Sequence, residues 1–478
     1  MDKALLLLGV VFMISSITIF ALQKKERDVV FARFNLKRRR NSGSRTPLWL
    51  FSPGRHRAHG VPAPDYSTTF PPSRRHVLGE SKDTLQGYNE CLIPLETSYH
   101  NAADDLRTPC NFSVAEIKAL GDFPDYAALS GVPLPKPYHE FDIQKALPRP
   151  YRPFRWAYHQ TMSIAKMEPD WWLELENTYE ERMKQRSQLF ARYGDAVLQA
   201  LPGSELACKE LMETALQFLC ARYPQYFSLN TSKTVLLNAI LKTETELRQT
   251  PPLHVILQNI PEDFAIMLRD EKTGHYVFRA GIICSALGWN VSTKIGLQLH
   301  EIHASIPDYN EKMRFSMDRY FARMATNKPI QRGSWGLEVD QPLFMPPGNP
   351  HEAQRGYQMP DLELARCHLR VDWQTLRRLP LSGAVLFNFK ALFTPVEDFI
   401  DEPYVPRLLL KVLNDGKKNL MDYKNAWHTE HAVKPALEIF HKKQVERGIV
   451  QKGWEPKTLD ESPWFPAWEE KWHRQQGF

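Results

Sequence analysis

Strand-like and helix-like stretches occupy separate parts of this 478-residue chain, and that separation constrains its fold most strongly. Short runs rich in β-branched and aromatic residues occur at 253–258, 263–269, 275–284, 336–340, 367–372 and 383–390. The second and third runs are joined by the turn-like residues 270–274, which predicts an antiparallel hairpin. Because strands and helices do not alternate regularly, we expect an antiparallel α+β domain with packed helices, not a doubly wound parallel sheet.

Predicted helices lie before, between and after these strands. Apolar residues at helical spacing predict helices at 168–193, 203–223, 308–326, about 373–379 and 421–440. The tail up to Phe478 carries four of the twelve tryptophans and is expected to pack back onto the body. We therefore predict a domain over residues 132–410 and a C-terminal helical extension over residues 411–478.

The N-terminal segment predicts a membrane anchor. Residues 4–22 are nineteen consecutive uncharged and mostly apolar residues, close to the ~20 that cross a bilayer as a helix. Lys3 is the only basic residue before this segment and a basic stretch follows it, which favours a retained anchor over residues 1–22 rather than a cleaved signal peptide. The same charges predict a single-pass membrane protein with a cytosolic body, in a membrane such as that of the endoplasmic reticulum.

Charge is concentrated directly after this segment. Residues 23–60 hold eleven Lys and Arg against two acidic residues, a sum of +9, and residues 1–22 cancel. Since the whole chain carries +6, residues 61–478 must carry 6 − 9 = −3. A slightly acidic body argues against nucleic-acid binding. Together with the Pro- and Ser-rich sequence that continues to residue 131, the pattern predicts a basic, partly disordered tether over residues 23–131.

Cysteines and glycosylation sequons bear on the compartment in opposite ways. The six cysteines contain no Cys-x-x-Cys and are sparse for this length, which predicts reduced thiols and no zinc ribbon. Three Asn-x-Ser/Thr sequons begin at Asn111, Asn230 and Asn290 and would be glycosylated in a lumenal body. The cysteine pattern favours the cytosolic body.

Several motifs of enzyme chemistry are missing from the sequence. It contains no Gly-x-Gly-x-x-Gly after a strand, no P-loop, no Gly-x-Ser-x-Gly elbow and no His-Glu-x-x-His helix. Any redox chemistry of this chain must therefore use electrons delivered from outside.

Two histidines, His300 and His303, lie three residues apart in an apolar run that Pro307 ends. If residues 296–304 are helical, both imidazoles lie on one face of the helix. No cysteine or carboxylate at metal-site spacing accompanies them, so one axial bond to a haem iron fits better than a zinc cage. A buried structural histidine is the alternative reading.

Six ordered blocks between about residues 134 and 410 resemble the α-subunit-like family of haem-dependent oxidative N-demethylases. They are residues 166–179, 262–267, 276–289, 294–307, 332–335 and 370–387. The resemblance implies a PAS-like fold that holds a b-type haem, often as a dimer, and the removal of a methyl group from a small amine with O2. It also implies that NADPH electrons arrive through a flavin and an iron–sulfur centre on a partner reductase.

The resemblance also implies roles for particular residues. His303 stands in an Ile-His-x-x-x-Pro element and is identified as the iron ligand, with His300 as the alternative. Guanidinium groups match carboxylates, so the candidate anchors for haem propionates are Arg332, Arg370, Arg377 and Arg378. The candidate pocket walls are Trp335 and Trp289. Candidates to orient O2 or a protonated amine are Gln374 and Thr375.

The chain departs from the family pattern near this presumed pocket. The family shows Pro-Val-Pro where this chain has residues 305–307, an Asn in place of Ser334, and Glu-Arg in place of Asp372 and Trp373. We therefore expect a membrane-anchored haem-dependent oxidase or monooxygenase acting on an amine whose identity is open. The alternatives are a non-catalytic PAS-like haem sensor or electron-transfer protein and a membrane-anchored glycosyltransferase.

Overall fold

The structure, a computed structural model, describes residues 63–79, 88–155, 161–459 and 461–478. The predicted anchor over residues 1–22 and the basic stretch that follows it lie outside these ranges. Within them, no helix has the length and apolar character needed to cross a bilayer. The chain divides into two units at residue 58, and the fold described below belongs to the second, His59–Phe478.

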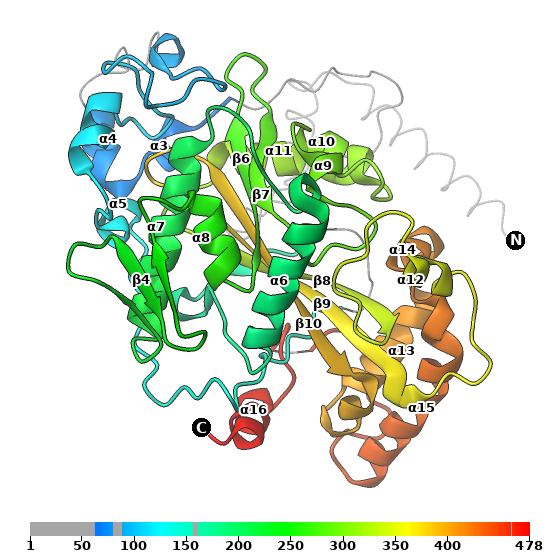
Figure 1. Cartoon of the computed structure of the whole chain (residues 1–478). Coiled ribbons are helices and arrows are strands. Elements are labelled where there is room, and N and C mark those ends of the chain that lie inside the picture. Colours follow the sequence, from blue (N-terminus) through cyan, green and yellow to red (C-terminus); the bar gives the residue numbers. More distant parts are fainter. Residues whose placement is uncertain (1–62, 80–87, 156–160, 460) are drawn as a thin grey trace, which may run out of the picture. The chain divides into compact units, whose positions relative to one another are not determined.

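An antiparallel sheet stands at the centre of this unit (Figure 1). Within the described residues it has seven strands in the order β1-β8-β9-β10-β6-β7-β2. Its strands are β1 (Ala165–Lys166), β8 (Ile330–Val339), β9 (Cys367–Arg378), β10 (Val385–Pro395), β6 (Asp263–Arg269), β7 (Tyr276–Ile282) and β2 (Leu198–Ala200). The predicted antiparallel α+β fold is confirmed, as is the β6–β7 hairpin, whose register pairs Arg269 with Tyr276.

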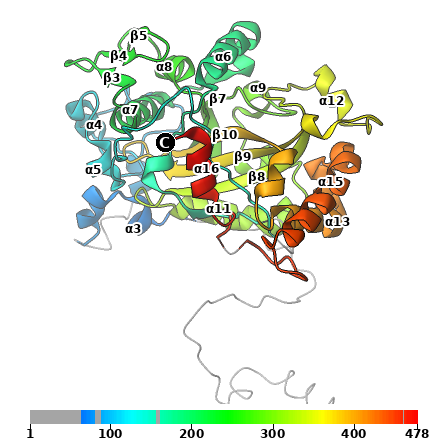
Figure 2. The same cartoon turned by 90° about the horizontal axis from the view of Figure 1, so that it is seen from below.

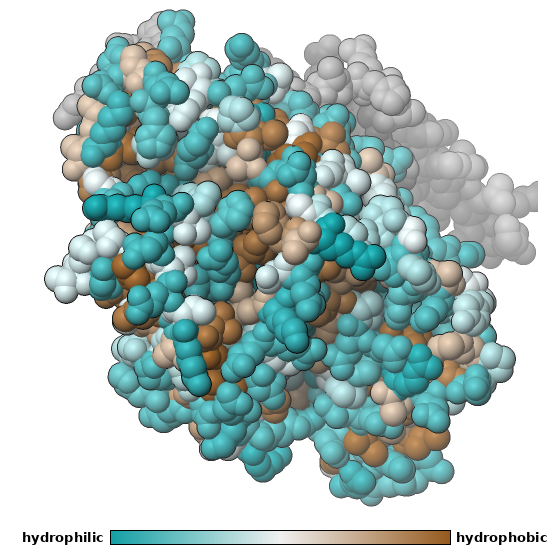
Figure 3. Space-filling view, in the orientation of Figure 1, coloured by the Kyte–Doolittle hydropathy of each residue, from teal (hydrophilic) through white to brown (hydrophobic). Residues whose placement is uncertain are grey.

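Helices cover both faces of the sheet (Figure 2). One face packs against α6 (Tyr179–Tyr193), α7 (Glu205–Arg222) and α8 (Pro252–Asn259) through buried residues that include Phe264 and Leu386. Hydrophilic residues cover much of the outside of these helices, and hydrophobic residues show between them (Figure 3). The other face packs against α10 (Leu299–Ile302) and α11 (Arg314–Arg323), and the β8–β9 end packs against α13 (Val405–Asp415) and α15 (Trp427–Glu446).

Shorter elements complete the fold. Among the described residues, the remaining α-helices are α3 (Tyr66–Thr69), α4 (Val114–Leu120), α5 (Tyr126–Ser130), α9 (Val291–Lys294), α12 (Pro350–Gln354), α14 (Lys418–Lys424) and α16 (Trp468–Gln476). A small separate sheet has β3 (Phe227–Leu229), β4 (Val235–Asn238) and β5 (Thr243–Glu246). A π-helical turn, Tyr309–Met313, leads into α11.

Two predicted elements are of the wrong type. Residues 253–258 lie in helix α8 instead of a strand, with Pro252 at its start; the pattern of so short an apolar run does not separate a helix from a strand. Residues 373–378 continue strand β9 instead of forming a helix, because they pair with β10 and, up to Leu376, also with β8. The predicted helix at 421–440 is two helices, α14 and α15, separated at Asn425, whose φ is +51°.

The second half of the predicted tether is folded. Between residues 88 and 131, Cys110, Phe112 and Tyr126 are buried with Leu206 and Leu381 of the main body. Helix α4 in this segment begins with a complete capping box at Ser113 and Glu116, a local signal that the surrounding prolines obscure. The folded unit therefore begins well before residue 132.

The C-terminal tail returns to the body. Trp472 is buried, and its indole N–H donates to the carbonyl oxygen of Leu147 at 2.8 Å. Phe478 contacts the rings of Tyr138 and Phe141. The tail thus joins the segment that precedes β1 to the rest of the chain.

Arg378, at the end of β9, fastens four segments of the protein together. Its side chain is 1% exposed and donates hydrogen bonds to the carbonyl oxygens of Met324 (2.7 Å), Gly383 (2.6 Å) and Phe321. It also donates to the hydroxyl of Tyr276 on β7 at 2.9 Å. Such a buried cation is tolerated because protein acceptors replace its water shell.

We predict that Arg378→Lys lowers the free energy of unfolding by about 3 kcal/mol, because a lysine cannot span these four acceptors and leaves buried carbonyls unpaired. Urea denaturation measures this. The control is Arg366→Lys, an exposed residue paired with Asp340, for which we expect a change below about 1 kcal/mol. Equal losses in the two variants would contradict the fastening role.

Candidate functional site

A cavity of about 830 Å³ lies between the sheet and the helices α9, α10, α11 and α14. This volume is within the roughly 300–1,000 Å³ of sites that hold small molecules and cofactors. Strands β6 to β10 provide one wall, and the loop at residues 285–289 and the segment at residues 161–164 complete the lining. The cavity is the candidate site.

The residues that line the cavity change from apolar to charged along the strands of the sheet. The first row of cross-strand neighbours is apolar and consists of Ile330, Leu376 and Phe387. Two residues further along each strand, the row is Arg332, Gln374 and Phe389. The next row holds Ser334 and Asp372, and the one after it Gly336 and Arg370. The helices facing the apolar end supply more apolar side chains, namely Leu299, Ile302, Met313, Met317 and Phe321.

His303 lines this cavity from the C-terminal end of helix α10. Its ring stacks on that of Tyr309, with centroids 5.1 Å apart and planes 10° apart. Its Nδ1 lies 2.6 Å from the carbonyl oxygen of Leu299, which can only accept, so Nδ1 carries the proton. In the neutral ring, Nε2 then holds the lone pair of a metal ligand.

The surroundings keep His303 neutral. Burial lowers the pKa of its imidazole to about 4, the hydrogen bond to Leu299 opposes this shift, and the positive charges of Arg332 and Lys294 add to it. At pH 7 the ring is therefore uncharged and its lone pair is not occupied by a proton. These are the properties that a nitrogen ligand needs.

His300 lies elsewhere. It is not among the residues that line the cavity, and its ring lies 5.5 Å from that of His275. Helix α10 is a single turn that ends at Ile302, so His303 follows the helix and does not share a helical face with His300. The expected common face over residues 296–304 is wrong for this reason.

The four candidate arginines divide between two sides of the sheet. Arg332 and Arg370 line the cavity. Arg377 lies on the opposite face, where its guanidinium carbon is 4.2 Å from the centre of the Trp172 ring, and burial lowers its pKa to about 10. Arg378 is held by the carbonyl oxygens described above. Only Arg332 and Arg370 can therefore meet a molecule in the cavity.

The two polar candidates on β9, Gln374 and Thr375, point to opposite faces of the sheet. Gln374 lines the cavity, and its Oε1 is buried without a hydrogen-bond partner among the described residues. The hydroxyl of Thr375 faces the other way and donates to Oδ1 of Asn388 at 2.7 Å. Because neighbouring strand residues point to opposite faces, only one of the two can reach the cavity.

Trp335 and Trp289, the candidate pocket walls, both line the cavity. Trp335 also packs edge-on against Phe154, with ring centroids 5.2 Å apart. Trp289 lies 6.0 Å from the ring of Phe389, which belongs to the second row of the cavity wall. The two indoles thus approach the cavity from different elements.

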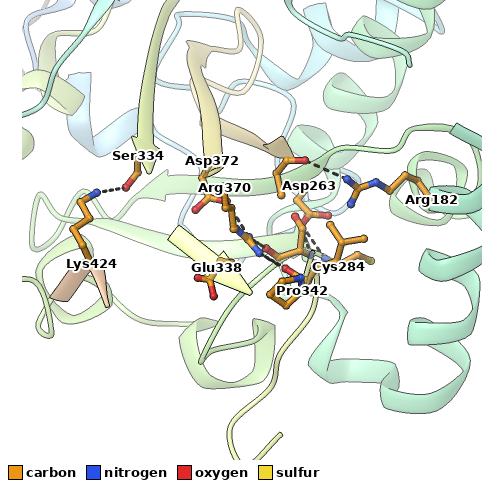
Figure 4. Close-up of polar contacts among 12 residues, drawn as sticks. Arg182, Asp263, Cys284, Ser334, Glu338, Pro342, Arg370, Asp372 and Lys424 are labelled. Atoms are coloured by element: carbon orange, nitrogen blue, oxygen red, sulfur yellow. Dashed lines mark hydrogen bonds and ion pairs between the residues drawn. The ribbon is translucent and has the colours of Figure 1, made fainter. Parts of the chain in front are cut away.

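Arg370 and Asp263 position the loop that follows β7 (Figure 4). Asp263 accepts hydrogen bonds from the backbone N–H groups of Cys284 (2.9 Å) and Ser285 (2.8 Å). Arg370 donates to the carbonyl oxygens of Ser285 and Pro342 and, through Nε, to Oδ1 of Asp372 at 3.0 Å. The guanidinium of Arg370 is therefore engaged in holding the wall of the cavity.

Lys424 is a cavity residue that the sequence reasoning missed. It ends helix α14, and its Nζ donates to the hydroxyl of Ser334 at 3.0 Å (Figure 4) and lies 5.2 Å from the centre of the Trp335 ring. Burial lowers the pKa of Lys424 to about 7, and the positive charge of Arg332 adds to this, whereas Asp372 opposes it. The sequence around it, a short polar helix beyond the predicted domain, carries no signal of this position.

Charge in the cavity is unbalanced. The basic residues among its described lining are Arg155, Lys294, Arg332, Arg355, Arg370 and Lys424. The acidic ones are Glu338 and Asp372. Glu338 is paired with Arg355, whose Nε lies 3.1 Å from its Oε2, and Asp372 is paired with Arg370. Positive charge is therefore in excess among the described residues of the lining.

In the part of the chain that the structure describes, no three His, Cys, Asp or Glu side chains are grouped so that they could hold a metal ion. A metal in this cavity would have to bring most of its ligands with it. One neutral histidine in an apolar cavity suits a metal held in a macrocycle.

Comparison with known families agrees with this chemistry. A family model described as haem-dependent oxidative N-demethylase, alpha subunit-like, matches residues 163–434. The match extends from the segment before β1 into helix α15 and includes both His303 and Lys424.

We predict that His303 carries its proton on Nδ1 in protein without added cofactor, because among the described residues the hydrogen-bond partner of Nδ1 is the carbonyl oxygen of Leu299. Nitrogen NMR of histidine-labelled protein at pH 7 should show a pyridine-type Nε2. The variant His303→Gln removes these signals and so assigns them, and His300→Gln, the control, leaves them in place. A proton on Nε2 of His303 would contradict the geometry.

Proposed function

The chain belongs to the haem-dependent oxidative N-demethylase, alpha-subunit-like family, and on that premise we propose that it is an oxidoreductase that binds haem in the cavity and oxidises an amine with O2. The observation that carries the proposal is His303, a neutral imidazole that lines the cavity and is tethered through Nδ1 to the carbonyl oxygen of Leu299. This arrangement leaves Nε2 for an axial bond to iron.

The residues of the cavity fit haem. The apolar row and the facing helices match the hydrophobic ring, and His303 would supply one nitrogen ligand. Arg332 and Lys294, whose charges act on His303, would meet the carboxylates at the edge of the ring. Arg370 supports the wall instead, since protein acceptors already engage its guanidinium.

Residues around the cavity have definite tasks in this scheme. The haem, when bound, supplies the activation of O2, and the protein supplies the ligand, the orientation and the exclusion of water. The carbonyl oxygen of Leu299 fixes the orientation of the imidazole and raises its basicity as a ligand. The buried Oε1 of Gln374 would accept a hydrogen bond from an N–H of the substrate.

The proposal also includes a PAS-like fold, a separate electron donor and attachment to a membrane. A PAS-like fold is supported by the five adjacent strands β8-β9-β10-β6-β7, with α9, α10 and α11 inserted between β7 and β8. A separate reductase as electron donor is supported by the missing nucleotide motifs of the sequence. Attachment to a membrane by one N-terminal pass, with the body in the cytosol, is supported by the apolar residues 4–22 and the basic residues after them.

An enzyme is favoured over a haem sensor by the length of the cavity. Beyond the row of Arg332 and Gln374 it continues past Ser334 to Arg370. Residues two apart on a strand are separated by about 6.6 Å, so this part offers a small molecule its own place. Oxygen consumption that depends on an added amine separates the two functions.

We predict that the full chain, purified in detergent and supplied with haem, shows a Soret band and a carbon monoxide difference spectrum. His303→Ala should weaken haem binding by about tenfold or more, because the axial bond is lost. His300→Ala is the matched control and should keep the spectrum of the unaltered protein. A band that His303→Ala leaves unchanged, or no band in the unaltered protein, would refute the proposal.

A further inference from the structure

The excess of positive charge in the cavity bears on what its second occupant can be. A dialkylamine is protonated at pH 7 and enters as a cation. Such a cation loses its water in the cavity and needs a carboxylate in exchange. Both carboxylates of the described lining are already bound by guanidinium groups of the same lining, Glu338 by Arg355 and Asp372 by Arg370.

Haem alone would not balance the charge. The described lining contains six basic and two acidic residues, an excess of 6 − 2 = 4 when Lys424 is protonated. A haem with two propionates would reduce this excess to about two. A dialkylammonium substrate would raise it again, whereas a zwitterion, whose carboxylate offsets its own ammonium group, would leave it unchanged.

The ionic end is built to receive such a group. Lys424 Nζ donates to the hydroxyl of Ser334, and Ser334 lies one row beyond Arg332 on β8. Neighbouring rows of the cavity wall are about 6.6 Å apart along the strand. This distance is close to the length of an amino acid. Gly336, in the next row, has no side chain, and a Cβ there would be in ordinary van der Waals contact with the carbonyl oxygen of Lys424, at 3.5 Å.

We propose that the amine oxidised by this protein carries a carboxylate, which Ser334 and Lys424 bind at the ionic end while the N-methyl group lies towards the apolar end. The inference rests on the proposed function and specifies its substrate class as N-methylated amino acids. Lys424 is a substrate-binding residue in this scheme. Its pKa of about 7 is consistent with this role, because a bound carboxylate would favour its protonated form.

Two probes of the same shape test the proposal. N,N-dimethylglycine carries the carboxylate, and N,N-dimethylisobutylamine replaces that carboxylate by an isopropyl group and is a simple cation. Titration calorimetry of the haem-loaded full chain in detergent measures both affinities. We expect N,N-dimethylglycine to bind at least about tenfold more tightly, as charge-assisted hydrogen bonds to the carboxylate require.

Variants of helix α14 supply the second arm of the test. Lys424→Met should weaken N,N-dimethylglycine about tenfold but should not weaken the isobutylamine, whose repulsion by the lysine is removed, and Lys424→Arg should retain most of the preference. Lys418→Met is the matched control on the same helix, because Lys418 is 88% exposed, and it should change neither affinity.

The outcomes separate this inference from the proposed function. Equal or tighter binding of the isobutylamine, no binding of either probe, or an equal loss of both in Lys424→Met overturns the carboxylate site, even where the Soret band is intact. A missing Soret band in the unaltered protein overturns the proposed function instead. In that case the same calorimetry on the haem-free chain still decides whether the ionic end selects a carboxylate.

Discussion

The pairing of β9 on both of its edges is the constraint on which the rest of this structure depends. The strand pairs with β8 and with β10 along nearly its whole length. Because successive side chains point to opposite faces, this register places Arg370, Asp372 and Gln374 in the cavity and Thr375 and Arg377 in the core behind it. A shift by one residue would exchange the two sets, so the pairing of β9 fixes the sheet and the site together.

Buried arginines show how the protein uses that constraint. Arg378 joins β9 to α11, to the β9–β10 turn and to β7, and Arg370 holds the loop after β7 against the strand. A guanidinium can serve several acceptors at once in a fixed plane, which suits a junction of several backbones better than a lysine does. These arginines give the cavity rigid walls. A rigid wall matters because a metal ligand, the role proposed for His303, acts only where its orientation is fixed in advance.

The gradient along the cavity connects the fold to the proposed chemistry. Its apolar end lies beside His303 and suits a hydrophobic ring, and its ionic end lies beside Lys424 and Ser334 and suits a charged group. The same strands supply both ends, two residues apart at each step, so the distance between the two is set by the rise of a β-strand. A substrate that reaches both ends is held in one orientation.

The sequence by itself determined the antiparallel α+β class, the β6–β7 hairpin, the family and His303 as a candidate ligand, because local period, turn residues and ordered motifs are properties of neighbours in the chain. Tertiary structure alone decided that residues 253–258 are a helix and 373–378 a strand, since an apolar run as short as 253–258 has no decisive period and the C-terminal half of β9 is fixed by its pairing with β8 and β10. It also divided Arg332 and Arg370 from Arg377 and Arg378, and it brought Lys424 into the cavity. These choices depend on strand register and on helix α14 packing ninety residues beyond Ser334, which no local pattern encodes.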